Sequence, residues 1–121
     1  MNIYLAAKFN EQPLMIQWAQ FLRHHSHFIT SRWLLANETI SVEQHQSEAL
    51  KDLNDIDACD VMISRTHSRG DLFTGGGRHI EFGYAYAKNK RLINVGGWEA
   101  VFHHLPGVVT VSSIEDVLKY L

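Results

Sequence analysis

The amino-acid sequence predicts an α/β protein with a flavodoxin-like three-layer fold and a roughly five-stranded parallel sheet. Short apolar segments alternate along the chain with segments whose apolar residues recur at helical spacing. This alternation is typical of a parallel sheet covered by helices on both faces. The chain has 121 residues, of which 45% are hydrophobic and 20% charged, as expected for one domain with one core. We therefore expect a single domain over residues 1–121.

Five segments have the apolar, β-compatible character of buried strands. They are Asn2–Ala7, Phe28–Leu35, Asp60–Ser64, Arg91–Val95 and Val108–Val111. Active sites of parallel sheets lie beyond the carboxyl ends of the strands, so we expect functional residues in the loops that follow the strands. These loops are Lys8–Pro13, Asn37–Ser41, Arg65–Gly77 and Gly96–Gly107.

Capping residues and apolar stripes predict the helices between the strands. Pro13 fits the first turn of the first helix, where proline is tolerated. The expected caps are Asn10, then Ser41 with Gln44, and finally Ser112 with Glu115, and the third helix is expected over Arg78–Lys88.

The composition excludes several classes of function. A formal net charge of -2 lacks the basic excess that binding to a nucleic-acid polymer needs. No apolar run approaches the roughly 20 residues that cross a bilayer, and no charged-then-apolar leader opens the chain. The single cysteine, Cys59, lies in an apolar stretch and is expected to be a buried small hydrophobe. We expect a soluble cytoplasmic protein that has no membrane partner.

Eight histidines raise the question of a metal site. No HExxH motif occurs, and no Cys/His pair has zinc-ligand spacing. We expect structural or surface roles for the histidines, with no metal and no cofactor.

The loop Thr66–Gly77 (THSRGDLFTGGG) is the first candidate for function. It follows a strand and precedes a helix, and a loop of this length in a compact domain is usually functional or mobile. Its consecutive glycines permit positive φ angles, and their N–H groups could hold an anion or a sugar hydroxyl. The run matches neither GxGxxG nor a Walker A loop.

Two acidic residues could carry chemistry. Glu81 is placed in the first turn of the third helix, where the helix dipole favours a carboxylate. Its segment IEFGYAYA is otherwise apolar, so solubility explains Glu81 poorly, and a cleft-facing role is an even alternative. Asp52 lies in the acidic segment DLNDIDACD, and its pattern alone gives it no priority.

Three segments of the chain resemble the nucleoside 2-deoxyribosyltransferase family, which includes 2'-deoxynucleoside 5'-phosphate N-hydrolases. They read IYLAAKF, DLNDIDACDVMI and EFGYAYAKNKRLINVGG, in the family's order. The resemblance implies a flavodoxin-like fold, a small-molecule deoxynucleoside or deoxynucleotide substrate, and homo-oligomers with active sites near subunit interfaces. It also implies that the enzyme cleaves an N-glycosidic bond without a metal.

The same resemblance implies roles for individual residues. Glu81 matches the catalytic nucleophile, and Asp52 matches the aspartate that assists the leaving base or orients the sugar. Tyr4 matches the first-strand tyrosine that holds the nucleophile, and Gly83 the helix glycine that lets the sheet approach. Two carboxylates in unlike environments can serve as nucleophile and proton donor at an anomeric carbon.

The substrate-binding residues are less closely matched. Transferases carry another carboxylate about six residues before the nucleophile, where this chain has Gly75, and Asp71 could replace it only if the loop folds back. Thr74 is the hydroxyl nearest to the serine of phosphate-using relatives. Phosphate or sugar contacts are further expected from Lys8, Gly76, Arg78, His79 and His103.

Several alternatives stay open after this comparison. Transfer and hydrolysis are both possible, as are nucleoside and 5'-monophosphate substrates. The missing carboxylate at Gly75 keeps a non-catalytic nucleotide-binding module on the same fold as a second hypothesis. A receiver domain is disfavoured because NIYLAAKF lacks an acidic cluster, and nothing indicates the adenosine pocket of an enzyme that cleaves dinucleotides.

Overall fold

The structure, a computed structural model, describes residues 1–37, 41–68 and 76–121. Its five strands form one all-parallel sheet in the order β2-β1-β3-β4-β5, which confirms the predicted flavodoxin-like fold. The strands are β1 (Asn2–Ala6), β2 (Phe28–Ile29), β3 (Val61–Arg65), β4 (Arg91–Val95) and β5 (Val109–Val111).

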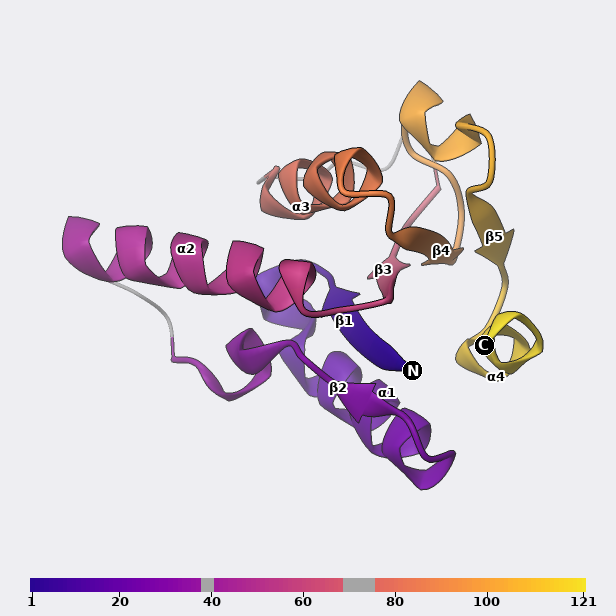
Figure 1. Cartoon of the computed structure of the whole chain (residues 1–121), viewed down its shortest axis with the longest axis horizontal. Coiled ribbons are helices and arrows are strands. Elements are labelled where there is room, and N and C mark those ends of the chain that lie inside the picture. Colours follow the sequence, from indigo (N-terminus) through magenta and orange to yellow (C-terminus); the bar gives the residue numbers. More distant parts are fainter. Residues whose placement is uncertain (38–40, 69–75) are drawn as a thin grey trace.

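Helices cover both faces of this sheet, α2 and α3 on one face and α1 and α4 on the other (Figure 1). The α-helices are α1 (Gln12–His24), α2 (Val42–Asp57), α3 (Gly77–Ala87) and α4 (Ile114–Val117). Short 3-10 helices occur at η1 (Phe9–Glu11), η2 (Arg32–Leu35), η3 (Val101–His104) and η4 (Leu118–Tyr120).

The register of the central strands decides which side chains face α2 and α3. Tyr4 pairs with Met62 of β3, and Met62 pairs with Leu92 of β4. Neighbouring residues in register point to the same face of a sheet, and successive residues along a strand alternate between faces. The Tyr4 hydroxyl reaches α3, so this row of side chains lies beneath α2 and α3.

The core is centred on β1 and β3, as their continuous apolar sequences predict. Ile3, Tyr4, Leu5 and Ala6 are each fully buried, and Cys59 is buried as expected. Burial also raises the pKa of the Cys59 thiol to about 11, so it stays protonated and inert at neutral pH. Each large apolar side chain buried in this way contributes about 1.5–3 kcal/mol.

The second predicted strand is much shorter than Phe28–Leu35. It ends at Ile29, and the chain turns into η2 at Arg32. The backbone N–H of Arg32 donates to Asp55 Oδ2, and its guanidinium donates to Asp55 Oδ1. Trp33 Nε1 donates to the Leu5 carbonyl. These polar contacts bend the apolar run toward α2, where its tryptophan is buried.

Helix caps agree with the sequence in one case and differ in two. Ser41 and Gln44 form the predicted capping box of α2. Asn10 is not a cap, because η1 occupies this region and Glu11 precedes α1. The last helix is capped by Ser113, whose hydroxyl accepts from the Asp116 N–H, and not by Ser112.

No helix among the described residues combines the length and the apolar character needed to cross a membrane.

Candidate active site

The centre of the site is a hydrogen bond between the first strand and the third helix. The Tyr4 hydroxyl donates to Glu81 Oε2. Tyr4 is fully buried, so its ring fixes the position of the hydroxyl. Glu81 therefore faces the sheet, and its carboxylate meets a donor that cannot move away.

Glu81 lies in the second turn of α3, and not in the first turn as expected. The helix starts one residue earlier than predicted, at Gly77, and has no acidic residue in its first turn. The stabilising effect of a helix dipole fades after the first turn. Glu81 therefore needs an explanation other than the dipole.

Burial raises the pKa of Glu81 to about 7. The hydrogen bond from Tyr4 lowers this pKa, and the nearby charge of Asp52 raises it again. A buried carboxyl group with a pKa near neutrality gains and loses its proton under ordinary conditions, and such groups cluster at functional sites.

Asp52 of α2 is the second carboxyl group at this place. Burial, followed by the charges of Glu48 and Asp55, raises the pKa of Asp52 to about 6. Asp52 also raises the pKa of both Tyr4 and Glu81 by its charge. Its Oδ1 atom is buried and has no hydrogen-bond partner in the described parts of the chain. The structure thus brings the three predicted catalytic residues together.

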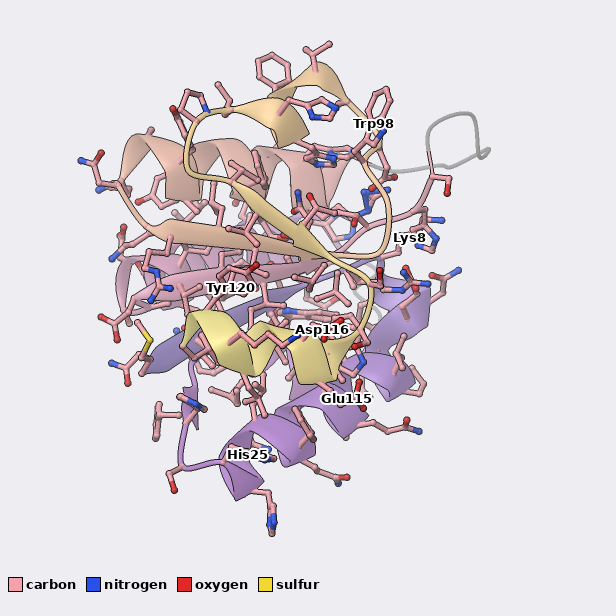
Figure 2. The ribbon with its side chains drawn as sticks, turned by 90° about the vertical axis from the view of Figure 1, so that its right-hand side faces the viewer. Lys8, His25, Trp98, Glu115, Asp116 and Tyr120 are labelled. Atoms are coloured by element: carbon pink, nitrogen blue, oxygen red, sulfur yellow. The ribbon has the colours of Figure 1, made fainter. Side chains whose placement is uncertain are left out.

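Lys8 lies two residues after the end of β1 and is half-buried at the start of η1. Figure 2 places Lys8 along the same edge of the molecule as Trp98, which follows β4. This is the edge formed by the carboxyl ends of the strands, where the sequence predicts substrate contacts.

The end of the glycine run is described only in part. Gly76 precedes α3 with φ −126° and accepts hydrogen bonds from the N–H groups of His79 and Ile80. Neither Gly76 nor Gly77 has the positive φ angle that the sequence suggested. The expected contacts of Asp71, Thr74 and Gly75 lie outside the described residues.

Arg78 differs most from its expected surroundings. Its side chain is only 4% exposed and forms a two-point ion pair with Glu99, with Nη2–Oε1 at 2.6 Å and Nη1–Oε2 at 3.1 Å. Sequence reasoning missed Glu99, although it is the one acidic residue of the segment 96–107. A phosphate would meet this guanidinium already paired with a carboxylate.

His103 and His79 lie next to this ion pair. His103 is 4% exposed, accepts at Nδ1 from the Glu99 N–H, and packs edge-on against Phe82. The rings of His79 and His103 are 5.9 Å apart. Burial, more than any charge, lowers the pKa of both imidazoles, so both are neutral at pH 7.

Gly83 does not have the role expected of it. A Cβ atom at this position would meet nothing within 4 Å, so the glycine is not needed for contact between α3 and the sheet. Close backbone contact occurs instead at Gly97, where a Cβ atom would lie 2.7 Å from the His67 carbonyl oxygen.

A separate cavity of about 440 Å³ opens at the carboxyl ends of β3 and β4. It is lined by Arg65, Thr66, His67, Ser68, Gly96, Gly97 and Ser112. The Glu11 carboxylate contacts two residues of the lining, the Arg65 guanidinium at 3.4 Å and the His67 imidazole at 2.9 Å. The lining is polar, but a carboxylate of the protein itself is already paired with its arginine.

The described residues contain no group of three or more His, Cys, Asp or Glu side chains that could hold a metal ion. The arrangement of Tyr4, Asp52 and Glu81 could support acid–base and nucleophilic chemistry by carboxyl groups.

Comparison with known proteins places the fold among nucleoside-processing enzymes. No family model and no curated protein sequence matches the chain. Two solved structures resemble it over nearly its whole length. A 2-deoxyribosyltransferase from Bacillus psychrosaccharolyticus has a TM-score of 0.78 and 22% identity, covering 100% of this chain and 93% of that one. The CMP N-glycosidase of Clostridium botulinum has a TM-score of 0.64 and 20% identity, covering 99% and 97%.

A third structure is similar over a shorter stretch. The 2-deoxyribosyltransferase of Leishmania mexicana has a TM-score of 0.58 and 19% identity, covering 78% of this chain and 63% of that one. The chain therefore has the fold of the nucleoside 2-deoxyribosyltransferases, and this is the class that its sequence resembles.

Proposed function

We propose that the protein is an enzyme that cleaves or transfers at the N-glycosidic bond of 2'-deoxynucleosides or their 5'-monophosphates. Glu81 is the nucleophile, Asp52 is the proton donor, and Tyr4 holds the nucleophile. The shared fold and the sequence resemblance support this class of reaction. We propose that the protein acts in nucleotide metabolism as a soluble cytoplasmic enzyme.

One observation carries the proposal, the hydrogen bond from the buried Tyr4 hydroxyl to Glu81 Oε2. A carboxylate partly buried in this way costs free energy, since its charged form is poorly solvated. The site next to it holds a second carboxyl group, Asp52, with an unpartnered buried oxygen among the described residues. A purely structural role for Glu81 would explain neither its burial nor this neighbour.

The reaction requires the ionised form of Glu81. Its other carboxylate oxygen, Oε1, attacks C1' of the sugar while the bond from C1' to the base nitrogen breaks, with a transition state that resembles an oxocarbenium ion. The Tyr4 hydroxyl, which donates to Oε2, keeps the carboxylate oriented and supports its negative charge. The product of this step is a glycosyl ester on Glu81 and a base that takes up a proton.

Asp52 supplies that proton from its carboxyl group, whose pKa of about 6 keeps part of it protonated near neutrality. A second base then attacks C1' to give transfer, or water attacks to give hydrolysis. In either case the ionised Asp52 takes up the proton that the attacking water or base loses, and Glu81 leaves as a carboxylate. The site thereby returns to its first state.

The sugar is proposed to lack the 2'-hydroxyl. Tyr4 occupies one oxygen of Glu81, so a hydroxyl on C2' would crowd the carboxylate that must reach C1'. A deoxyribosyl cation also forms more easily than a ribosyl cation. Since one enzyme of this fold is named for CMP, a ribonucleotide, the ribose forms belong in the test.

The test is to incubate the protein with deoxynucleosides, deoxynucleoside 5'-monophosphates and their ribose counterparts, each with and without an acceptor base. Free or exchanged base is measured by chromatography. We expect base release from a deoxy substrate, and a loss of at least about a hundredfold in Glu81→Gln, equivalent to roughly 3 kcal/mol of transition-state stabilisation. Glu115→Gln, on the exposed side of α4, is the matched control and should keep full activity.

The result also separates the alternatives. Retained activity in Glu81→Gln would refute the nucleophile. Binding of a nucleotide without release of base from any substrate would favour the non-catalytic binding module.

We further propose a homodimer or higher homo-oligomer. Aromatic side chains after β4 support this assembly, since Phe102 is 63% and Trp98 37% exposed. Val101 is 70% exposed beside Phe102, whereas the nearby Leu105 packs on the core. An exposed apolar group of this kind is a common mark of an interface.

A further inference from the structure

The segment from Gly96 to His104 contacts both ends of the connection between β3 and α3. At its start, Gly96 and Gly97 lie so close to the backbone of Thr66 and His67 that a Cβ atom on either would overlap it. Two residues after Gly97, Glu99 forms an ion pair with Arg78 in the first turn of α3. One short segment thus holds the exit of β3 and the entry of the helix that carries Glu81.

The pair of Arg78 and Glu99 is an unusual way to hold a helix. A cation in the first turn is disfavoured by the positive end of the helix dipole. Both side chains are nearly inaccessible, at 4% and 7% exposed, so each loses its hydration. Apolar residues of similar size can often replace such a buried pair without loss of stability. Stability alone therefore does not account for it.

Geometry is what the pair adds. The planar guanidinium and the carboxylate meet in two parallel hydrogen bonds, which fix direction as well as distance. The backbone N–H of Glu99 also donates to Nδ1 of His103 at 3.0 Å, and the His103 ring packs on Phe82, the residue after Glu81. The contacts at Arg78 and at Phe82 therefore hold α3 on either side of Glu81.

We propose that Glu99 is a positioning residue that acts through Arg78 to hold the first turns of α3 so that Glu81 meets the Tyr4 hydroxyl. This rests on the function proposed above. Arg78 then serves the site as part of the support of α3.

The inference predicts a split between stability and function. In Glu99→Gln the two-point pairing with Arg78 is lost, so kcat for base release should fall at least tenfold while KM changes less than threefold. Arg78→Lys keeps the charge but loses the planar fork, and it should show the same fall. The double variant Arg78→Met/Glu99→Met should regain the melting temperature of the wild type but not its kcat.

A stability-matched control comes from the opposite face of the sheet. Val117 of α4 is fully buried there, and Val117→Ala should lower the melting temperature without lowering kcat at a temperature where it is folded. If the double variant regains kcat together with stability, or if Glu99→Gln keeps kcat, the pair is only structural and the inference is overturned.

A second measurement does not depend on activity. The proton shared by Tyr4 and Glu81 should give a low-field NMR resonance that disappears in Tyr4→Phe and Glu81→Ala. It should also disappear in Glu99→Gln and in the double variant, but remain in Val117→Ala. If the resonance is lost in both Glu99 variants and the wild-type protein releases no base, the positioning role is supported and the proposed reaction is refuted. Retention in both Glu99 variants would overturn the inference whatever the activity.

Discussion

The hydroxyl of Tyr4 donates to Glu81 across 77 residues of sequence, and this contact joins the first strand to the third helix at the candidate active site. Neither residue can move independently, because the tyrosine is fully buried in β1 and the glutamate is held by α3. The contact favours the ionised form of Glu81, whereas burial opposes it. The balance between the two determines the fraction of Glu81 that can act as a nucleophile.

Removal of the hydroxyl should reveal this balance. In Tyr4→Phe the ring packing is kept, but a hydrogen bond to a charged group, worth about 1.5–3 kcal/mol, is lost. The pKa of Glu81 should rise above its present value of about 7, since burial is no longer opposed. We expect kcat/KM at pH 6 to fall roughly 10- to 100-fold, and to fall less at pH 8.

Tyr84→Phe is the matched control, because the Tyr84 hydroxyl also donates to a carboxylate, that of Asp57, but at the surface. It should leave the pH profile unchanged. An equal loss at pH 6 and pH 8 in Tyr4→Phe would contradict the explanation.

The pH dependence of the wild type follows from the two raised pKa values. The reactive form has Glu81 ionised and Asp52 protonated, so the pair must hold one proton. With pKa values of about 7 and about 6, the pair loses its first proton near pH 6 and its second near pH 7. The profile of kcat/KM should be bell-shaped, with its maximum between these values.

Asp52→Asn should remove the alkaline limb of this profile, and it should slow poor leaving groups more than good ones. A flat profile between pH 5 and pH 8 would show that neither carboxyl group takes part.

The ionised form of Glu81 is needed for activity but should lower the stability of the folded protein. Its pKa is about 7 in the folded protein and 4.5 in the unfolded reference, so folding is favoured by the protonated form. This contribution is complete below pH 4.5 and is lost as the pH rises to 7. Glu81→Gln removes the cost of burying the charge and should stabilise the protein at pH 8 by up to about 3 kcal/mol.

Urea unfolding at pH 4 and pH 8 measures this difference, which should vanish at pH 4. A loss of stability at pH 8 would mean that Glu81 has a structural role.

The sequence predicts the parallel sheet and the positions of the four α-helices well because most of their signals are local. The capping box at Ser41 and the apolar run of β3 need no distant partner to be recognised. The segment Phe28–Leu35 was predicted wrongly for the opposite reason. Its course depends on Asp55, which lies far along the chain and draws Arg32 out of the strand direction.

The site shows the same division. Tyr4, Asp52 and Glu81 could be singled out together only by resemblance, since no local pattern joins residues on β1, α2 and α3. Arg78 was interpreted as a phosphate ligand because its partner was not known. An arginine in the first turn of a helix calls for a carboxylate, and Glu99 in the loop after β4 could have been considered for that reason.

Gly83→Ala tests a position where the resemblance and the structure differ. Glycine in the middle of a helix costs roughly 0.5–1 kcal/mol relative to alanine, and a Cβ atom here would meet open space. Thermal unfolding should therefore show a gain in stability of about that size. Gly96→Ala is the contrasting variant, because φ is +130° and the Cβ atom would overlap the Thr66 carbonyl, and it should be destabilised.

The last prediction concerns the oligomer. If the exposed group of Trp98, Val101 and Phe102 forms the contact between subunits, the wild type should sediment as a dimer or larger assembly at micromolar concentration. Phe102→Ser should shift it toward the monomer, because it removes a large apolar side chain from the centre of the contact. Phe28 is similarly exposed, at 68% against 63%, but lies at the start of β2, so Phe28→Ser should leave the assembly intact. Sedimentation velocity over a hundredfold range of concentration distinguishes the variants. A wild-type monomer throughout that range would rule out the oligomer, and equal effects of the two substitutions would place the contact elsewhere on the surface.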